Sequence, residues 1–142
     1  FSVLVVAVRW FRDLLPESGD RAFLARIGAY LAGRHDEVPP SGRFNAGQKL
    51  LFATQVVVTG VLFGTGVLLW WPELFGPSLR LFAIVLHPAA AVIAILSILV
   101  HVHLGLLITR GSFKAMTEGT VSESWARYHH GRWADRILGP KR

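Results

Sequence analysis

The chain has 142 residues, of which 52 % are hydrophobic, and it carries a formal net charge of +6. So apolar a composition is typical of a membrane protein rather than a soluble domain, and the length fits one domain at most. The chain has no cysteine, which excludes disulfides, cysteine zinc sites and thiolate-held iron–sulfur clusters within it.

The first segment, residues 1–12, opens with the apolar run FSVLVVAV. The run is too short to cross a bilayer, which takes about 20 residues. It also lacks the basic start and the cleavage pattern of a signal peptide. We therefore expect residues 1–12 to be the end of a transmembrane helix that begins upstream, in a longer intact protein.

Residues 13–47 predict a loop that contains an amphipathic helix. The stretch SGDRAFLARIGAYLAG places apolar residues at helical spacing. Ser18 or Asp20 can cap this helix and Gly33 can end it. The helix lies either on the membrane surface or against a partner, or it is an ordinary packed helix, and the sequence leaves these readings open.

Residues 48–109 predict a transmembrane hairpin with one span at about 48–71 and a second at about 79–109. Each span is long enough for a bilayer core of about 30 Å. The turn between them, PELFGPS, is short, so the two helices are antiparallel neighbours. The fold class is therefore an all-α membrane protein: a transmembrane helix bundle with two full spans and the end of a third in this chain.

The basic residues predict the topology. Of the 15 Lys and Arg residues, 14 precede or open the first full span or follow the second, and only Arg80 lies at the far turn. Because cytoplasmic loops carry the excess of Lys and Arg, we expect the loop and the tail at 110–142 to be cytoplasmic. In that tail, VSESWARYHHGRW predicts a helix capped by Ser122, with Trp125, His129 and Trp133 along one face.

Two histidines in the second span, His87 and His101, are 14 residues apart. This spacing is about 40° short of four helical turns, so both lie on one face, about 21 Å apart along the axis. The same face carries small or narrow residues, which leave room for a flat porphyrin: Ala83, Ala91, Ala94, Ile98, Gly105 and Thr109. The pattern favours two haems, each taking one ligand from this helix.

Other interpretations of these features remain open. Small residues can simply allow close helix packing, with each histidine donating to a neighbouring carbonyl or hydroxyl. Zinc fits less well, because no third ligand shares the face. His103 lies on the opposite side and is expected to reach the interface or a partner, while His35, His129 and His130 are expected to be surface residues.

The first span carries glycines and two polar residues. Gly60 and Gly64 form a GxxxG pattern, which indicates either close helix contact or room for a porphyrin. Gln55 and Thr59 are expected to form interhelical hydrogen bonds, with a proton path as the alternative.

Three features together resemble the cytochrome b, or gamma, subunit of membrane-bound respiratory formate dehydrogenase. They are RFNAGQK at 43–49, the pair His87 and His101, and RGSFKAMTEGTVSESWARYHHGRW at 110–133. The resemblance covers essentially the whole chain, and the box and the tail motif carry it. It implies a four-helix bundle that holds two b haems when complete.

The resemblance also implies roles for individual residues. His87 would bind the haem nearer the periplasm and His101 the haem nearer the cytoplasm. Asn45, Gly47 and Gln48 match the box beside the quinone pocket, to which His101 also belongs through its haem. Without the resemblance, Asn45 at a helix start would be interpreted as a cap.

The family's partners follow from the same resemblance. An iron–sulfur (beta) subunit delivers electrons, a catalytic (alpha) subunit with molybdenum or tungsten oxidises formate, and a quinone accepts the electrons. The chain would therefore have no formate chemistry of its own. We expect a multi-pass protein of the bacterial cytoplasmic (inner) membrane, in contact with lipid, with loop 13–47 and the C-terminus cytoplasmic.

The chain departs from the family pattern in one respect. The family's other axial ligands come from its first two helices, of which only the end of the second matches, at residues 1–12. The second ligand of each haem is thus expected outside this chain. Alternatives are the cytochrome b subunit of a related hydrogenase, thiosulfate reductase or other molybdenum oxidoreductase, and a non-redox membrane anchor. Nucleic-acid binding is disfavoured, because the basic residues sort by membrane side.

Overall fold

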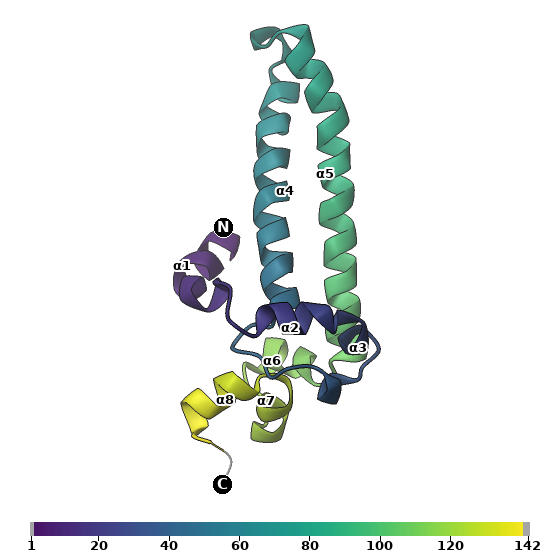
Figure 1. Cartoon of the computed structure of the whole chain (residues 1–142). Helices are drawn as coiled ribbons and strands as arrows, with labels where there is room; N and C mark the ends of the chain where they lie inside the picture. Colours follow the sequence, from purple (N-terminus) through teal and green to yellow (C-terminus); the bar gives the residue numbers. More distant parts are fainter. Residues whose placement is uncertain (1, 141–142) are drawn as a thin grey trace. The chain divides into compact units, whose positions relative to one another are not determined.

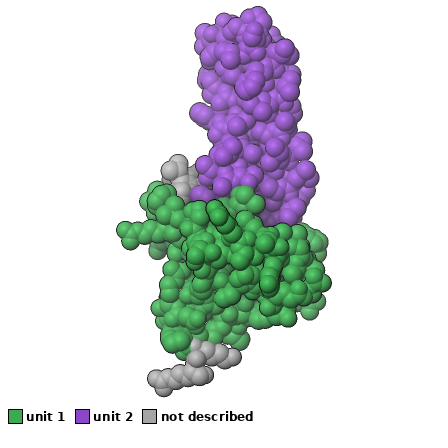
Figure 2. All heavy atoms as spheres, viewed as in Figure 1, with its two compact units in different colours: residues 1–50, 102–142 green, residues 51–101 purple. Residues whose placement is uncertain are grey.

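The computed structural model describes residues 2–140, and within that range the chain is built of helices and turns without strands (Figure 1). It divides into two compact units, coloured in Figure 2. The interfacial unit comprises residues 1–50 and 102–142, and the hairpin unit comprises residues 51–101.

Two long helices account for the predicted spans. Helix α4 runs Ala46–Trp70, and α5 runs Pro77–His103 and continues into a π-helical turn, Leu104–Ile108. The 3-10 turn Pro72–Leu74 lies between them. Both helices are long and apolar enough to cross a membrane. The two predicted spans are confirmed as helices, and α5 continues unbroken through Pro88.

Within the hairpin unit, a polar contact joins α4 to α5. Gln55 Nε2 donates to Ser97 Oγ at 2.5 Å and reaches the Ala94 carbonyl at 3.4 Å. The predicted interhelical hydrogen bond of Gln55 is therefore confirmed. Thr59 is exposed and forms no side-chain hydrogen bond with any residue in 2–140, so the same expectation for Thr59 stays a prediction.

The glycine prediction needs a correction as well. A Cβ added at Gly60 or Gly64 would meet no atom within 4 Å. Both lie on the side of α4 away from its buried residues Val58 and Thr65. Close helix contact at this GxxxG pattern is therefore wrong within the described chain. Instead Gly66 approaches α5, where an added Cβ would lie 3.7 Å from His87 Cε1.

The interfacial unit consists of short helices and turns. Its first helix, α1, contains an irregular residue at Trp10 (φ −123°, ψ 22°). The elements of the unit, besides the first turn of α4 and the turn that follows α5, are α1 Ser2–Leu14, α2 Asp20–Ala25, α3 Ile27–Leu31, the 3-10 turn His35–Glu37, α6 Ser112–Glu118, α7 Glu123–His129 and α8 Gly131–Leu138.

The single amphipathic helix predicted for the loop is wrong, because the chain breaks at Arg26 (φ −112°, ψ 18°) between α2 and α3. Neither predicted cap is used, since the residue before α2 is Gly19, without a side-chain cap. The Asp20 carboxylate instead accepts the Glu17 N–H and pairs with Lys49. Gly33 follows α3 with a positive φ of 76°, a conformation that glycine adopts readily.

The tail prediction is half confirmed. Ser122 caps α7, accepting the Trp125 N–H at 3.2 Å. The helix then stops at His129, because His130 leaves helical geometry (φ −136°, ψ 50°). Trp133 therefore belongs to α8, and the predicted face shared with Trp125 and His129 on one helix is wrong.

Candidate functional site

Both candidate haem ligands lie on α5 in the hairpin unit. His87 is half-buried, and its Nδ1 lies 2.9 Å from Thr65 Oγ1 on α4. Its Nε2 has no hydrogen-bond partner among residues 2–140. His101 is exposed, and neither of its ring nitrogens is hydrogen-bonded within the same range. Each imidazole thus keeps a nitrogen available for a metal.

The predicted stripe of small residues is divided between different surroundings. Ala83 is fully buried, and Ala91 and Ala94 are half-buried. In contrast, a Cβ added at Gly105 would meet no atom within 4 Å, and Ile98 is 44 % exposed. The alanines upstream therefore serve helix packing, which supports the packing alternative for that part. Thr109 at the end of the stripe is only 7 % exposed, so within the stripe open surface is found only at Ile98 and Gly105.

The amides of the NAGQK box form a reciprocal cap at the start of α4. Asn45 Oδ1 accepts the Gln48 N–H at 2.9 Å, and Gln48 Oε1 accepts the Asn45 N–H at 2.9 Å. This capping box satisfies two backbone donors of the first turn. Each amide keeps its NH₂ group, and Gln48 Nε2 has no partner in residues 2–140.

Tyr30, on α3, completes the surroundings of the box. Asn45 Nδ2 donates to the Tyr30 hydroxyl at 3.3 Å, and that oxygen lies 3.1 Å from Thr109 Oγ1. A Cβ at Gly47 would come within 3.3 Å of Asn45 Oδ1, so the glycine leaves room for the cap. The structure brings Asn45, Gly47 and Gln48 together. His101 belongs to the other unit, and its share in a quinone pocket stays a prediction.

Sequence reasoning missed the role of Lys49, the last residue of the box. Its side chain is only 8 % exposed, and Nζ lies 3.0 Å from Asp20 Oδ2 and 3.6 Å from Glu17 Oε1. Glu17 also meets Arg132 of α8 at 3.3 Å. A lysine at the start of an apolar span, with Glu17 and Asp20 among the acidic residues of the preceding loop, was the available signal for this buried ion cluster.

The expectation that the remaining histidines are surface residues is wrong for His130. It is 8 % exposed, and its Nδ1 lies 3.0 Å from the Gly42 carbonyl oxygen. Burial lowers the pKa of His130, although the hydrogen bond to Gly42 opposes the shift. Burial, then the nearby charges of His35 and His130, lower the pKa of His129 to about 4.

His35 and His129 border a pocket of about 360 Å³ in the interfacial unit. Their ring centroids are 4.8 Å apart, and His35 Nε2 is buried without a hydrogen-bond partner among residues 2–140. The other lining residues are Gly33, Leu107, Ile108, Arg110, Tyr128. The pocket presents the imidazoles of His35 and His129 and the guanidinium of Arg110, and it does not include the amides of the NAGQK box.

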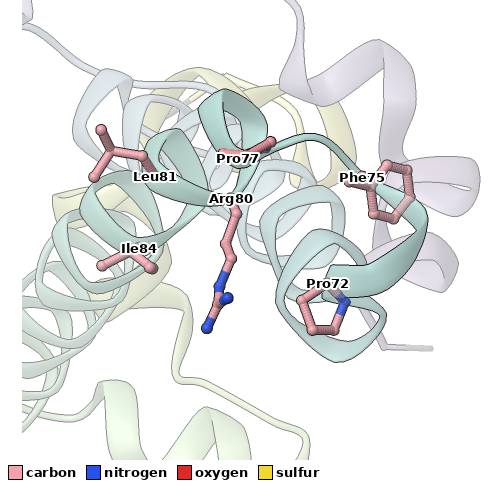
Figure 3. A pocket seen from close by; sticks show the side chains of 6 residues that line it. All are labelled: Pro72, Phe75, Pro77, Arg80, Leu81 and Ile84. Atoms are coloured by element: carbon pink, nitrogen blue, oxygen red, sulfur yellow. The ribbon is translucent and has the colours of Figure 1, made fainter.

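A second pocket, of about 210 Å³, lies at the turn between the long helices (Figure 3). Arg80 is its one charged lining residue, and the others are Pro72, Phe75, Pro77, Leu81 and Ile84. No side-chain amide lines it.

Comparison with known proteins places these features in a family. A sequence model of prokaryotic cytochrome b561 matches residues 1–119. The nitrate-inducible formate dehydrogenase cytochrome b556(Fdn) subunit of Escherichia coli K12 is 34 % identical over 139 residues, 96 % of this chain and 64 % of that protein. The formate dehydrogenase cytochrome b556 subunit of Haemophilus influenzae is 31 % identical over 136 residues, 94 % of this chain and 57 % of that protein.

The cytochrome b556(fdo) subunit of Escherichia coli K12 is 39 % identical over 103 residues, which cover 70 % of this chain and 48 % of that protein. The chain therefore spans between about half and two thirds of the length of these relatives. The name cytochrome b implies haem b, and two long apolar helices agree with a membrane protein. The chain belongs to the prokaryotic cytochrome b561 family and is an all-α membrane cytochrome b.

Proposed function

We propose that this chain is part of the cytochrome b subunit of a formate dehydrogenase complex, where it carries electrons across the membrane from an iron–sulfur partner to a quinone. The observation that supports this most is the placement of His87 and His101 on one long apolar helix, about 21 Å apart along its axis. The identity with formate dehydrogenase cytochrome b556 subunits supports the choice of complex.

The donor set fits a porphyrin iron at each position. The chain offers one imidazole per site, which is what one axial position requires. Nε2 of His87 and both ring nitrogens of His101 are unpartnered within residues 2–140. Haem b, when bound, supplies a one-electron carrier at each position. The second axial ligands are proposed to come from helices outside this chain.

We place the quinone beside the NAGQK box. The reciprocal cap fixes the orientation of both amides, because each oxygen is held by a backbone N–H. The Gln48 NH₂ group remains free to donate to a quinone carbonyl, while the Asn45 NH₂ group is held by Tyr30. Gly47 contributes by leaving room for the cap. His101 is proposed to join this pocket through its haem.

The orientation follows from the basic residues. Because 14 of the 15 Lys and Arg residues lie on one side of the predicted hairpin, the loop 13–47 and the tail 110–142 are proposed to be cytoplasmic, in a bacterial inner membrane. Quinone protons would then come from the cytoplasm. The proposed partners are the iron–sulfur subunit, the catalytic molybdenum or tungsten subunit and membrane lipid.

The experiment that tests this function separates two roles of the Gln48 side chain, namely capping α4 and donating a hydrogen bond to the quinone. Gln48→Glu keeps an oxygen for the cap and removes the NH₂ donor, whereas Gln48→Leu removes both. In the assembled complex, the decay of the reduced b-type bands after addition of a quinone analogue is followed by stopped flow. We expect both variants to slow the decay tenfold or more, because a hydrogen bond to a charged group contributes about 1.5–3 kcal/mol.

The outcomes discriminate between the candidate functions. An unchanged decay rate in both variants would leave the box as a helix cap and move the quinone elsewhere. Reduction of the b-type bands by hydrogen rather than formate would assign the chain to a hydrogenase. A complex without any b-type bands would leave only a non-redox anchor.

A further inference from the structure

We infer that Thr65 on α4 is a positioning residue for His87: its hydroxyl fixes the imidazole tautomer and leaves Nε2 free for the haem iron. This inference rests on the proposed function, which makes His87 a haem ligand. Sequence reasoning assigned no role to Thr65. Both residues belong to the hairpin unit.

The hydroxyl has a single proton, and the geometry decides where it goes. Thr65 Oγ1 lies 2.7 Å from the Val61 carbonyl oxygen on its own helix, and 2.9 Å from His87 Nδ1 on α5. A carbonyl oxygen can only accept and the bond to Val61 is the shorter of the two, so we assign the hydroxyl proton to that bond. Thr65 Oγ1 then accepts a hydrogen bond from His87 Nδ1–H, so the ring proton is on Nδ1.

The tautomer has a direct consequence for ligation. A neutral imidazole with its proton on Nδ1 has a lone pair on Nε2, the nitrogen without a partner in residues 2–140. Ligating histidines usually donate their second ring N–H in this way, which fixes the ring and raises its basicity.

The simpler interpretation is a threonine that bonds back to its own helix. Thr65 does so, but this bond uses only the hydroxyl proton and leaves the oxygen free to accept. Thr65 is 4 % exposed, so that free lone pair is cut off from solvent and needs a donor. His87 Nδ1 is the donor the structure provides. His101 has no such partner among the described residues, so the two candidate haem sites differ in this respect.

A matched pair of substitutions tests the inference in membranes that contain the complete complex. Thr65→Val has nearly the same shape but no hydroxyl, and Thr65→Ser keeps the hydroxyl. Thr59→Val makes the same chemical change at an exposed position of α4. Haem content, low-temperature b-type spectra and a redox titration are recorded for each variant.

We expect Thr65→Val to shift the midpoint potential of one b-type component upward, because a less basic ligand stabilises ferric iron less. The other component should not move, and Thr65→Ser and Thr59→Val should titrate as the unmodified complex does. Unchanged components in Thr65→Val, or equal shifts of both, would overturn the inference. If His87→Ala kept both components, the proposed ligation itself would fail. If His87→Ala lost one b-type component while Thr65→Val left both midpoint potentials unchanged, the ligation by His87 would stand and only the role of Thr65 would fail.

Discussion

The interfacial unit and the hairpin unit are held together by different means. The interfacial unit, residues 1–50 and 102–142, contains ten of the fourteen buried side chains among the described residues, and of these Lys49, Asn45 and His130 are polar and paired. The hairpin unit leaves large apolar side chains uncovered, as at Phe63, 75 % exposed. The first unit pairs buried polar side chains within itself, although His35 Nε2 and Arg132 Nε have no partner among residues 2–140, whereas the second exposes an apolar surface of the kind that lipid covers.

The largest effect is expected at the ion cluster of the interfacial unit. Lys49→Met leaves the carboxylates of Asp20 and Glu17 without their lysine, and removal of one partner from a buried ion pair costs about 3–5 kcal/mol. Because Glu17 is partly exposed, we expect the lower end of this range. Amide hydrogen exchange of α2 and the start of α4 measures the loss.

The exposed pair of Lys114 and Glu118 provides the control. Lys114→Met should change exchange of α6 by about 0.5 kcal/mol or less, since exposed pairs contribute little. Equal effects of the two substitutions would show that the buried cluster does not hold the interfacial unit together.

The second prediction concerns Gly111, whose φ is +92°. An added Cβ would lie 2.9 Å from Trp125 Cδ1, and Trp125 Nε1 donates to the Arg110 carbonyl at 2.8 Å. Gly111→Ala must therefore displace the indole as well as strain the backbone. Gly119 has a similar φ of +70° with open space around it, so Gly119→Ala should cost only the strain, about 1–2 kcal/mol.

Thermal unfolding of the purified protein in detergent compares the two glycine variants. We expect Gly111→Ala to lower the melting temperature clearly more than Gly119→Ala does. The reverse order would mean that Trp125 is not packed on this turn.

A smaller effect is expected from pH. The pKa of His129 is lowered from 6.5 to about 4, mainly by burial. Between these values the unfolded chain binds a proton that the folded chain does not, so stability is complete above about pH 6.5 and falls as the pH drops toward 4. The lowered pKa of His130 acts in the same direction.

Hydrogen exchange of α7 and α8 between pH 7 and 4.5, corrected for the intrinsic rate, measures this loss. His129→Gln should flatten the dependence, while His103→Gln, a change at an exposed histidine, should not. A profile that is the same with and without His129 would contradict the assignment.

The smallest effect is expected in the hairpin unit. Gln55→Leu removes the hydrogen bond to Ser97, and such bonds between membrane helices average about 0.6 kcal/mol. Thermal unfolding of the complex in lipid nanodiscs should change little. If Gln55→Leu lowered stability as much as Lys49→Met does, the hairpin unit would also depend on a polar contact of its own. The proposed difference between the two units would then be wrong.

The sequence predicts the long helices well for a physical reason. Length and apolar composition alone determine whether a segment can span a bilayer, and α4 and α5 meet both conditions. The cap at Ser122 was predictable too, since a serine before a helix satisfies a local backbone donor.

The ends of the short helices and the pairing of buried polar side chains were not predictable from the sequence. Both depend on contacts between residues far apart along the chain. His130 ends α7 where its ring reaches the Gly42 carbonyl, 88 residues earlier. Asp20 does not cap α2, because its carboxylate forms an ion pair with Lys49. Thr59 and Thr65 look alike in the sequence, and only the face that α4 turns toward α5 distinguishes them.

The central claim is that His87 and His101 bind separate haems from one helix face. Reduced-minus-oxidised spectra and a redox titration of the complex with His101→Ala test it most directly, with His103→Ala as the control for a neighbouring exposed histidine. The account predicts that His101→Ala loses one of two b-type components and keeps the other, while His103→Ala keeps both. Loss of both components together in His101→Ala, or of neither, would contradict it.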